Sequence, residues 1–215
     1  MEAESKRNIN PTRQYDHLFP PAKMTERLLI NRDEEVEETV ELMRNIVFRT
    51  LNQTEKIANL LRKPTRLETC RAIWNFIYNH IQYEFDSEHQ EELRTPARTW
   101  ADRFRGVDCD CMSIFTSSIL TNLNIPHDFR ITAYKQKGMF GSYCGDYQHV
   151  YVIAYDEYDR PIIIDCVTDR FNFEVKPCKK KDMAVAELSG VRGKRFSGNG
   201  EGVMNLLSTI DKIQK

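Results

Sequence analysis

The sequence lacks the segments expected of a membrane-anchored, secreted or repetitive protein. No apolar run approaches the roughly 18 residues of a transmembrane helix, and residues 1–10 are polar and charged rather than a signal peptide. No internal repeat is visible, and 215 residues of which 40% are hydrophobic suit one globular domain with terminal extensions. We therefore predict a protein with no membrane partner, located in the cytoplasm.

The chain also lacks an excess of charge of either sign. Its 31 Lys and Arg residues face 32 Asp and Glu residues, a formal net charge of −1, so the whole molecule has no bias toward nucleic acid. The basic residues near the C-terminus, in the stretch 176–181 and at Arg192, Lys194 and Arg195, are interpreted as a solvated surface. A nucleic-acid partner is therefore not expected, and the sequence says nothing about oligomeric state.

Changes in composition divide the chain into three parts. Residues 1–32 contain Asn10-Pro11 and Pro20-Pro21 without a sustained period, which predicts a flexible N-terminal arm. Residues 33–175 form the predicted domain. Residues 176–215 form a basic and glycine-rich extension, in which residues 204–213 are expected to be an amphipathic terminal helix.

The first half of the domain has helical periodicity and the second half has strand periodicity. Helices are predicted to begin near Asp33, Asn52, Thr65, Thr95 and Asp108, from acidic first turns, capping boxes, N-caps and apolar steps of three and four residues. Alternating patterns predict strands around 129–134, 147–155 and 162–167, with a loop over 135–146 that could overhang a cleft. The order predicts an α+β fold with an antiparallel sheet.

The six cysteines contain no C-x-x-C pair, and the single C-x-C, Cys109 with Cys111, disfavours a zinc site. Cys70, Cys111 and Cys166 lie where apolar side chains are expected, so they are interpreted as core residues, and Cys144 as an exposed loop cysteine without a role. Cys109 follows Asp108, a good N-cap, and so stands in the first turn of a buried helix, where a thiol can be activated.

Two downstream residues could complete a catalytic site with Cys109. His149 lies inside one predicted strand and Asp165 inside the next, where an acid is costly unless it is paired. If residues 156–160 form the hairpin connection, His149 faces Val167 and Tyr151 faces Asp165. His149 and Asp165 then lie on the same face as diagonal neighbours, provided that the turn has this length.

These residues resemble a known family. Arg-Gly-Val-Asp-Cys-Asp-Cys at 105–111, the helix ending at Asn-Ile-Pro 124–126, His-Val-Tyr-Val at 149–152 and Ile-Ile-Asp at 163–165 are similar to the core of the transglutaminase-like cysteine protease superfamily. The segment 76–83 is similar to the helix that precedes this core. The resemblance covers about residues 65–168, and it is strongest to small stand-alone prokaryotic and phage-encoded members.

The resemblance implies a transglutaminase-like, papain-like α+β core in which Cys109 is the nucleophile, His149 the base and Asp165 the orienting acid. The oxyanion hole would then combine the Cys109 N–H with an upstream donor, for which Tyr83 and Trp100 are the candidates. No counterpart of the calcium sites of animal transglutaminases is found, so neither a metal nor a cofactor is expected.

The expected activity is hydrolysis of a peptide or glutamine side-chain amide, or transfer of its acyl group to an amine, with a protein or peptide as the substrate. The carboxylates of Asp108 and Asp110 flank Cys109 and oppose formation of its thiolate. They favour an alternative, a non-catalytic binding or assembly module such as a phage or mobile-element structural protein, which could be virion-associated. A catalytic Cys109 requires a free thiol, hence the expectation of a reducing compartment.

Overall fold

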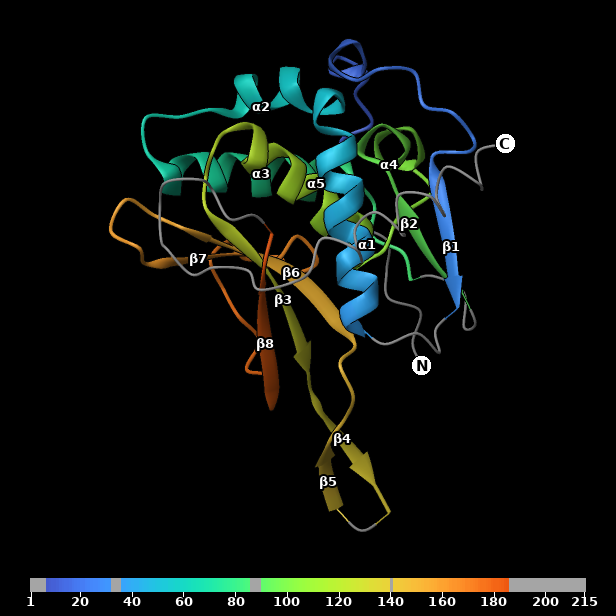
Figure 1. The fold of residues 1–215 in the computed structure, drawn as a ribbon, viewed down its shortest axis with the longest axis vertical. Helices are drawn as coiled ribbons and strands as arrows, with labels where there is room; N and C mark the ends of the chain where they lie inside the picture. Colours follow the sequence, from blue (N-terminus) through green and yellow to red (C-terminus); the bar gives the residue numbers. More distant parts are fainter. Residues whose placement is uncertain (1–6, 32–35, 86–89, 140, 186–215) are drawn as a thin grey trace, which may run out of the picture.

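The computed structural model describes residues 7–31, 36–85, 90–139 and 141–185. Helices gather on one side of an antiparallel sheet, and a narrow hairpin projects away from the body (Figure 1). The helices are α1 (Val36–Arg49), α2 (Glu55–Leu61), α3 (Arg66–His80), α4 (Pro96–Asp102) and α5 (Cys109–Asn122), with 3-10 turns at Asp16–Leu18 and Leu51–Gln53. The predicted order of helices first and antiparallel sheet second is confirmed.

The N-terminal caps of three helices are the ones that the sequence indicates. Thr65 and Glu68 form a reciprocal capping box at α3, the Thr95 side chain accepts from the Arg98 N–H at α4, and the Asp108 side chain accepts from the Cys111 N–H at α5. The capping box predicted at Asn52 is wrong. Residues Leu51–Gln53 form a 3-10 turn instead, and α2 begins at Glu55 without a side-chain cap.

Strands β7 (Pro161–Ile164), β6 (His149–Tyr155), β3 (His127–Ala133) and β8 (Lys179–Ala184) form the main sheet in that order. Helix α5 contacts β6, β3 and all four other helices, so it runs through the middle of the core. Ten consecutive residues of α5, from Cys111 to Leu120, are buried. A helix buried all round holds its first residue in a fixed place relative to the sheet.

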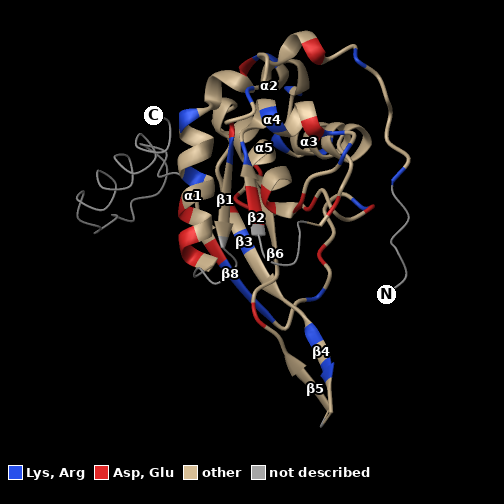
Figure 2. Ribbon diagram, turned by 90° about the vertical axis from the view of Figure 1, so that its right-hand side faces the viewer, with Lys and Arg blue, Asp and Glu red and all other residues tan. Residues whose placement is uncertain are grey.

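Strand β8 and the remaining strands were not expected from periodicity. Strand β1 (Arg27–Asn31) pairs antiparallel with β2 (Gln90–Arg94), and β4 (Lys135–Gly138) pairs with β5 (Gly141–Cys144). The predicted loop 135–146 is thus largely a hairpin that points away from the body (Figure 2). Every described residue of β4 and β5 is exposed. No buried face exists to impose an alternation of apolar and polar residues there.

The flexible arm predicted over residues 1–32 is wrong for its described part. Phe19 is buried and stacks on Trp100, with 4.6 Å between the ring centroids, and β1 lies in a sheet. Arg7 donates hydrogen bonds to two carbonyl oxygens beyond β7. Proline-rich chain without a period can still pack when its aromatic side chains find partners far along the sequence.

The domain boundary predicted at residue 175 is also misplaced. Strand β8 completes the main sheet beside β3, and its first three lysines each have a partner. Lys179 lies over the Tyr147 ring, Lys180 pairs with Glu174, and Lys181 pairs with Glu37. The lysine run therefore joins this edge of the sheet to its neighbours. The glycine-rich stretch, the basic residues from Arg192 onward and the terminal helix predicted over 204–213 lie outside the described residues.

Cys144 is not the unattached loop cysteine that was expected, since it forms a disulfide with Cys178. The bond ties the base of the β4–β5 hairpin to the segment that leads into β8. Its partners are 34 residues apart, and no sequence motif announced the pair. None of the helices among the described residues has the length and apolar character needed to cross a membrane.

Candidate active site

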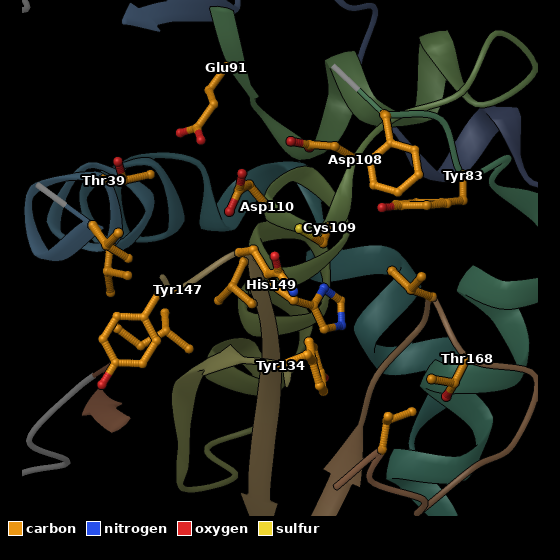
Figure 3. A pocket seen from close by; sticks show the side chains of 18 residues that line it. Thr39, Tyr83, Glu91, Asp108, Cys109, Asp110, Tyr134, Tyr147, His149 and Thr168 are labelled. Atoms are coloured by element: carbon orange, nitrogen blue, oxygen red, sulfur yellow. The ribbon is translucent and has the colours of Figure 1, made fainter. Parts of the chain in front are cut away.

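Cys109 is the first residue of α5 and lies at a cavity of about 740 Å³. The side chain of Asp108 caps the helix, which places the Cys109 thiol at its N-terminal end. The residue is half-buried. Val150, which follows His149 on β6, lines the same cavity as the Cys109 thiol. In Figure 3 both Cys109 and His149 point into this cavity.

The pairing of β6 with β7 has the predicted register. Val152 lies opposite Ile164 and Tyr155 opposite Pro161, around the expected connection of residues 156–160. The ladder ends at Ile164, one residue before Asp165, yet continuing it brings His149 and Asp165 together. His149 Nε2 lies 2.9 Å from Asp165 Oδ2. The conditional prediction that the two side chains meet on one face is therefore confirmed.

This hydrogen bond determines which ring nitrogen of His149 can act as a base. A carboxylate only accepts, so Nε2 carries a proton and donates it to Asp165. Nδ1 is left as the unprotonated nitrogen of the neutral ring. Asp165 is 4% exposed, and its Oδ1 accepts from the Val167 N–H at 3.0 Å. Both carboxylate oxygens thus have donors, which offsets the cost of burying the charge.

The electrostatic surroundings of Cys109 oppose a permanent thiolate. Burial raises the pKa of the Cys109 thiol well above its usual value, and the charges of Asp110 and Asp108 raise it further. The backbone of Val150 lowers this pKa and so works in the opposite direction. The resting group is therefore a thiol rather than a thiolate, and a base would have to remove its proton during the reaction.

Of the two candidates for the oxyanion hole, the structure separates Tyr83 from Trp100. Trp100 is 4% exposed, its Nε1 donates to Asp16 Oδ1 at 3.0 Å, and it is not among the cavity-lining residues. The Trp100 prediction is wrong, because the N-terminal segment occupies its only donor. Tyr83 lines the cavity and its hydroxyl points toward Cys109 in Figure 3.

The backbone supplies the other expected donor. The N–H groups in the first turn of a helix have no carbonyl partner within that helix, and the Cys109 N–H is one of them. Tyr83 is held beside the same turn because it forms a parallel bridge with Val107, two residues before Cys109. The Cys109 N–H and Tyr83 Oη are therefore the two groups that could stabilise an oxyanion.

Several residues at the cavity have no sequence signal of their own. Tyr134 accepts a hydrogen bond from Thr132 Oγ1 at 3.2 Å, and its ring lies 6.5 Å from that of His149. Val36 and Val40 of α1 form part of the opposite wall, and Glu91 of β2 adds a third carboxylate to those of Asp108 and Asp110. These residues come from three separate segments, so their meeting depends on the tertiary fold.

The other free cysteines agree with their interpretation as packing residues. Cys70, Cys111 and Cys166 are all buried. Burial raises the pKa of Cys70 and of Cys166 to about 12, which leaves both unreactive near neutral pH. Cys109 is the one cysteine among the described residues that is both free and partly accessible.

One group of described residues has metal-ligand spacing. A carboxylate oxygen from each of Asp108 and Asp110 and the Cys109 Sγ lie within 4.8 Å of one another. Carboxylates suit hard cations such as Ca²⁺, but two of them fall short of the six to eight oxygen ligands that Ca²⁺ takes. One oxygen of Asp108 already caps α5. The prediction that the protein holds no metal stays a prediction.

Comparison with solved structures gives two similar folds. A protein described as a "putative cysteine protease" from Cytophaga hutchinsonii matches 65% of this chain with 19% identity and a TM-score of 0.38. Calcium-bound LapG of Legionella pneumophila matches 81% with 15% identity and a TM-score of 0.41. The fold of this chain is similar to theirs. The match spans 48% of the Cytophaga protein and 99% of LapG.

Both matches are low in sequence identity and in TM-score, so neither assigns a role to this chain. No protein-family model matches the chain, and no curated protein matches it by sequence. The expected phage origin stays a prediction. At such low similarity, the role of Cys109 depends on the contacts of its own side chain.

Proposed function

We propose that this protein is a cysteine-dependent amide hydrolase that acts on a peptide or a glutamine side chain. The observation that carries the proposal is the 2.9 Å hydrogen bond between His149 Nε2 and Asp165 Oδ2 at the cavity where Cys109 begins α5. A nucleophile, a base and a residue that orients the base are the three parts of a triad. Here they come from a helix, a strand and the turn after the next strand.

In the proposed reaction the Cys109 sulfur attacks the carbonyl carbon of the amide while His149 Nδ1 takes the thiol proton. The negative oxygen of the tetrahedral intermediate accepts from the Cys109 N–H and the Tyr83 hydroxyl. The C–N bond then breaks as the imidazolium returns its proton to the departing amine, leaving a thioester. Water attacks the thioester, His149 takes a proton from it, and the acid is released as Cys109 regains its proton.

An amine could replace water in the second step, which would make the protein an acyl transferase. The chemistry at Cys109, His149 and Asp165 is the same in both cases, because the base deprotonates whichever nucleophile arrives. A screen with fluorescence-quenched peptides, run with and without a fluorescent primary amine, separates the two. Hydrolysis releases fluorescence without labelling the acyl fragment, and transfer labels that fragment.

The test of the triad is the alkylation of Cys109 by iodoacetamide, followed by mass spectrometry of the peptide that contains it. We expect His149→Ala to slow alkylation of Cys109 at pH 7 by about tenfold or more, since the base is lost. Cys70 and Cys166 provide internal references, because both are buried and should stay unmodified in either protein. Equal rates in the two proteins, together with no cleaved peptide in the screen, would contradict the proposal.

The raised pKa of Cys109 favours one alternative, a non-catalytic binding or assembly module. Such a module would keep the same fold without using the thiol. Under this alternative Cys109→Ser leaves partner binding unchanged. The wild-type protein then cleaves no peptide of the screen and transfers none to the fluorescent amine. Labelling of Cys109 that disappears in His149→Ala would exclude it.

A further inference from the structure

Three consecutive carbonyl oxygens follow strand β7, and each one is held by a side chain. The Asp165 oxygen accepts from Trp74 Nε1 at 2.9 Å and from Thr168 Oγ1 at 3.1 Å. The Cys166 oxygen accepts from Arg7 Nη1 at 2.7 Å, and the Val167 oxygen accepts from Arg7 Nη2 at 2.8 Å. The β6–β7 ladder ends at Ile164, so the carbonyl groups of residues 165–167 have no partners on β6 within the ladder. The side-chain hydrogen bonds hold this part of the backbone in place instead.

Arg7 reaches this turn from the opposite end of the chain, 159 residues away. Its guanidinium lies over the Tyr78 ring, 4.5 Å from the centroid, and Tyr78 stacks on Trp74 with centroids 4.9 Å apart. Arg7 and Trp74 are thus the two ends of one stack, and both ends donate to the same turn. The Asn10 N–H, which donates to the Asn79 oxygen at 2.7 Å, attaches this segment to the end of α3.

The same guanidinium also lies near Tyr83, which lines the cavity. It lies 5.7 Å from the ring centroid of Tyr83, the remaining side-chain candidate for the oxyanion hole. The charges of Arg7 and the buried Asp165 attract each other, and the pKa of Arg7 is raised by that attraction although burial lowers it overall. The guanidinium binds the two carbonyl oxygens that follow Asp165, so its charge lies within electrostatic range of the carboxylate that orients His149.

We propose that Arg7 is a positioning residue of the triad: its guanidinium fixes the turn 165–167 and the Tyr83 ring, and so keeps the Asp165 carboxylate on His149. This inference rests on the proposed function of Cys109, His149 and Asp165. It makes the N-terminal segment part of the working enzyme rather than an appendage. Arg7 touches neither the thiol nor the imidazole, so its effect passes through Asp165 and Tyr83.

The test compares wild type with Arg7→Ala and with Arg13→Ala, a matched variant at an exposed arginine of the same segment. Two readouts are measured on the full chain. The first is the downfield proton resonance of His149 Nε2–H, which reports the hydrogen bond to Asp165. The second is the rate at which iodoacetamide alkylates Cys109, relative to the same measurement in the His149→Ala background.

We expect Arg7→Ala to remain folded, to lose the His149 Nε2–H resonance through exchange with water, and to slow His149-dependent alkylation by about tenfold, while Arg13→Ala matches wild type. Guanidinium chloride at millimolar concentration, far below denaturing levels, should restore both readouts in Arg7→Ala by occupying the vacated site. A merely structural loss would not be rescued in this way. Arg7→Lys, which keeps the charge but not the fork of donors, should lie between the two.

The proposal is overturned if Arg7→Ala keeps the His149 resonance and alkylates like Arg13→Ala. If Arg7→Ala does not fold, Arg7→Lys decides the matter, because retention of both readouts at the wild-type level would equally overturn it. Failure of the proposed function has a different signature. Wild type would then alkylate no faster than His149→Ala, while the His149 resonance would still report whether Arg7 holds Asp165 in place.

Discussion

His149 and Asp165 are joined by a 2.9 Å hydrogen bond although Asp165 lies beyond the last pair of the β6–β7 ladder, Val152 with Ile164. The ladder leads the chain toward His149, and the turn after the ladder fixes the position of the Asp165 carboxylate. Trp74, Thr168 and Arg7 hold the carbonyl oxygens of that turn. The contact that defines the proposed triad therefore depends on two side chains from distant segments, Trp74 and Arg7, and on Thr168 of the turn itself.

Removing the charge of Asp165 should leave the fold intact and disable the base. In Asp165→Asn the amide can donate to His149 Nε2, which favours the tautomer with the proton on Nδ1 and so removes the base. We expect hydrolysis of a peptide found in the screen to fall roughly 10²- to 10⁴-fold at unchanged melting temperature. The measurement is kcat/KM, and a loss of less than about threefold would show that Asp165 does not orient His149.

Neutralising Asp110 should make Cys109 more reactive toward small electrophiles. Asp110 is the largest electrostatic cause, after burial, of the raised pKa of the Cys109 thiol. In Asp110→Asn this pKa falls, and each unit of the fall increases the thiolate fraction at pH 7 about tenfold. Alkylation at pH 7 should accelerate accordingly. Asp108→Asn, which preserves an N-cap residue, should act in the same direction more weakly, and the exposed Asp169→Asn should have no effect.

The buried His127 should make the protein sensitive to acid. Its Nε2 lies 2.8 Å from Ser117 Oγ and its Nδ1 2.8 Å from the Ile125 oxygen, and burial lowers the pKa of His127 to about 4. Above about pH 6.5 the ring is neutral in both folded and unfolded chains. As the pH falls toward 4 only the unfolded chain takes up the proton, which lowers the free energy of unfolding by up to about 3 kcal/mol.

Denaturant unfolding at pH 7.0 and pH 4.5 measures this effect, with His127→Gln as the non-titrating comparison. The variant is less stable at pH 7 because it loses part of the hydrogen-bonding pattern, but its stability should fall less over the same pH interval. An equal fall in both proteins would mean that His127 is not the group responsible.

The disulfide between Cys144 and Cys178 should stabilise the fold without being required for the thiol chemistry. Closing a loop of this length contributes about 4 kcal/mol to the free energy of unfolding, which the double variant Cys144→Ser with Cys178→Ser should lose. Alkylation of Cys109 should still depend on His149 in that variant. Denatured, unreduced wild type should show four free thiols out of the six cysteines. Six free thiols would contradict the bond.

Gly106 should tolerate no side chain, because it has a φ of 114° and a Cβ added there would lie 2.4 Å from the Glu84 Cβ. Gly106 precedes Cys109 by three residues, so the clash would displace the backbone that leads into the nucleophile. We expect Gly106→Ala to lower the free energy of unfolding by about 2 kcal/mol or more. Gly141→Ala is the control, with a similar φ of 120° and open space around it, and should cost about 1 kcal/mol.

The disulfide also bears on where the protein works. Disulfides persist in oxidising compartments, whereas the sequence led to the expectation of a reducing cytoplasm. A catalytic Cys109 requires only that its own thiol be free, and Cys109 is free while Cys144 and Cys178 are bonded. The cytoplasmic location stays a prediction, and fractionation of cells that express the protein tests it directly.

The sequence by itself determined the helices with strong caps, the central strands and the residues of the proposed triad. Local rules suffice for these features: Thr65 and Asp108 satisfy N–H groups of their own helices, and the five-residue connection after Tyr155 sets the register that aligns His149 with Asp165. Each of these choices depends on residues close in the chain, where spacing determines geometry.

Only the tertiary structure decided the parts that depend on contacts between distant segments. The N-terminal segment looks flexible because it has no period, yet Phe19 stacks on Trp100 and Arg7 binds the turn after Asp165. Trp100 cannot serve as an oxyanion donor because its Nε1–H donates to Asp16, which lies 84 residues earlier in the chain. The bond between Cys144 and Cys178 likewise joins segments whose proximity no pattern encodes. The spacing of residue types in a sequence determines contacts between residues close in the chain. Contacts between distant segments depend on how the whole chain packs, so they are visible only in the folded structure.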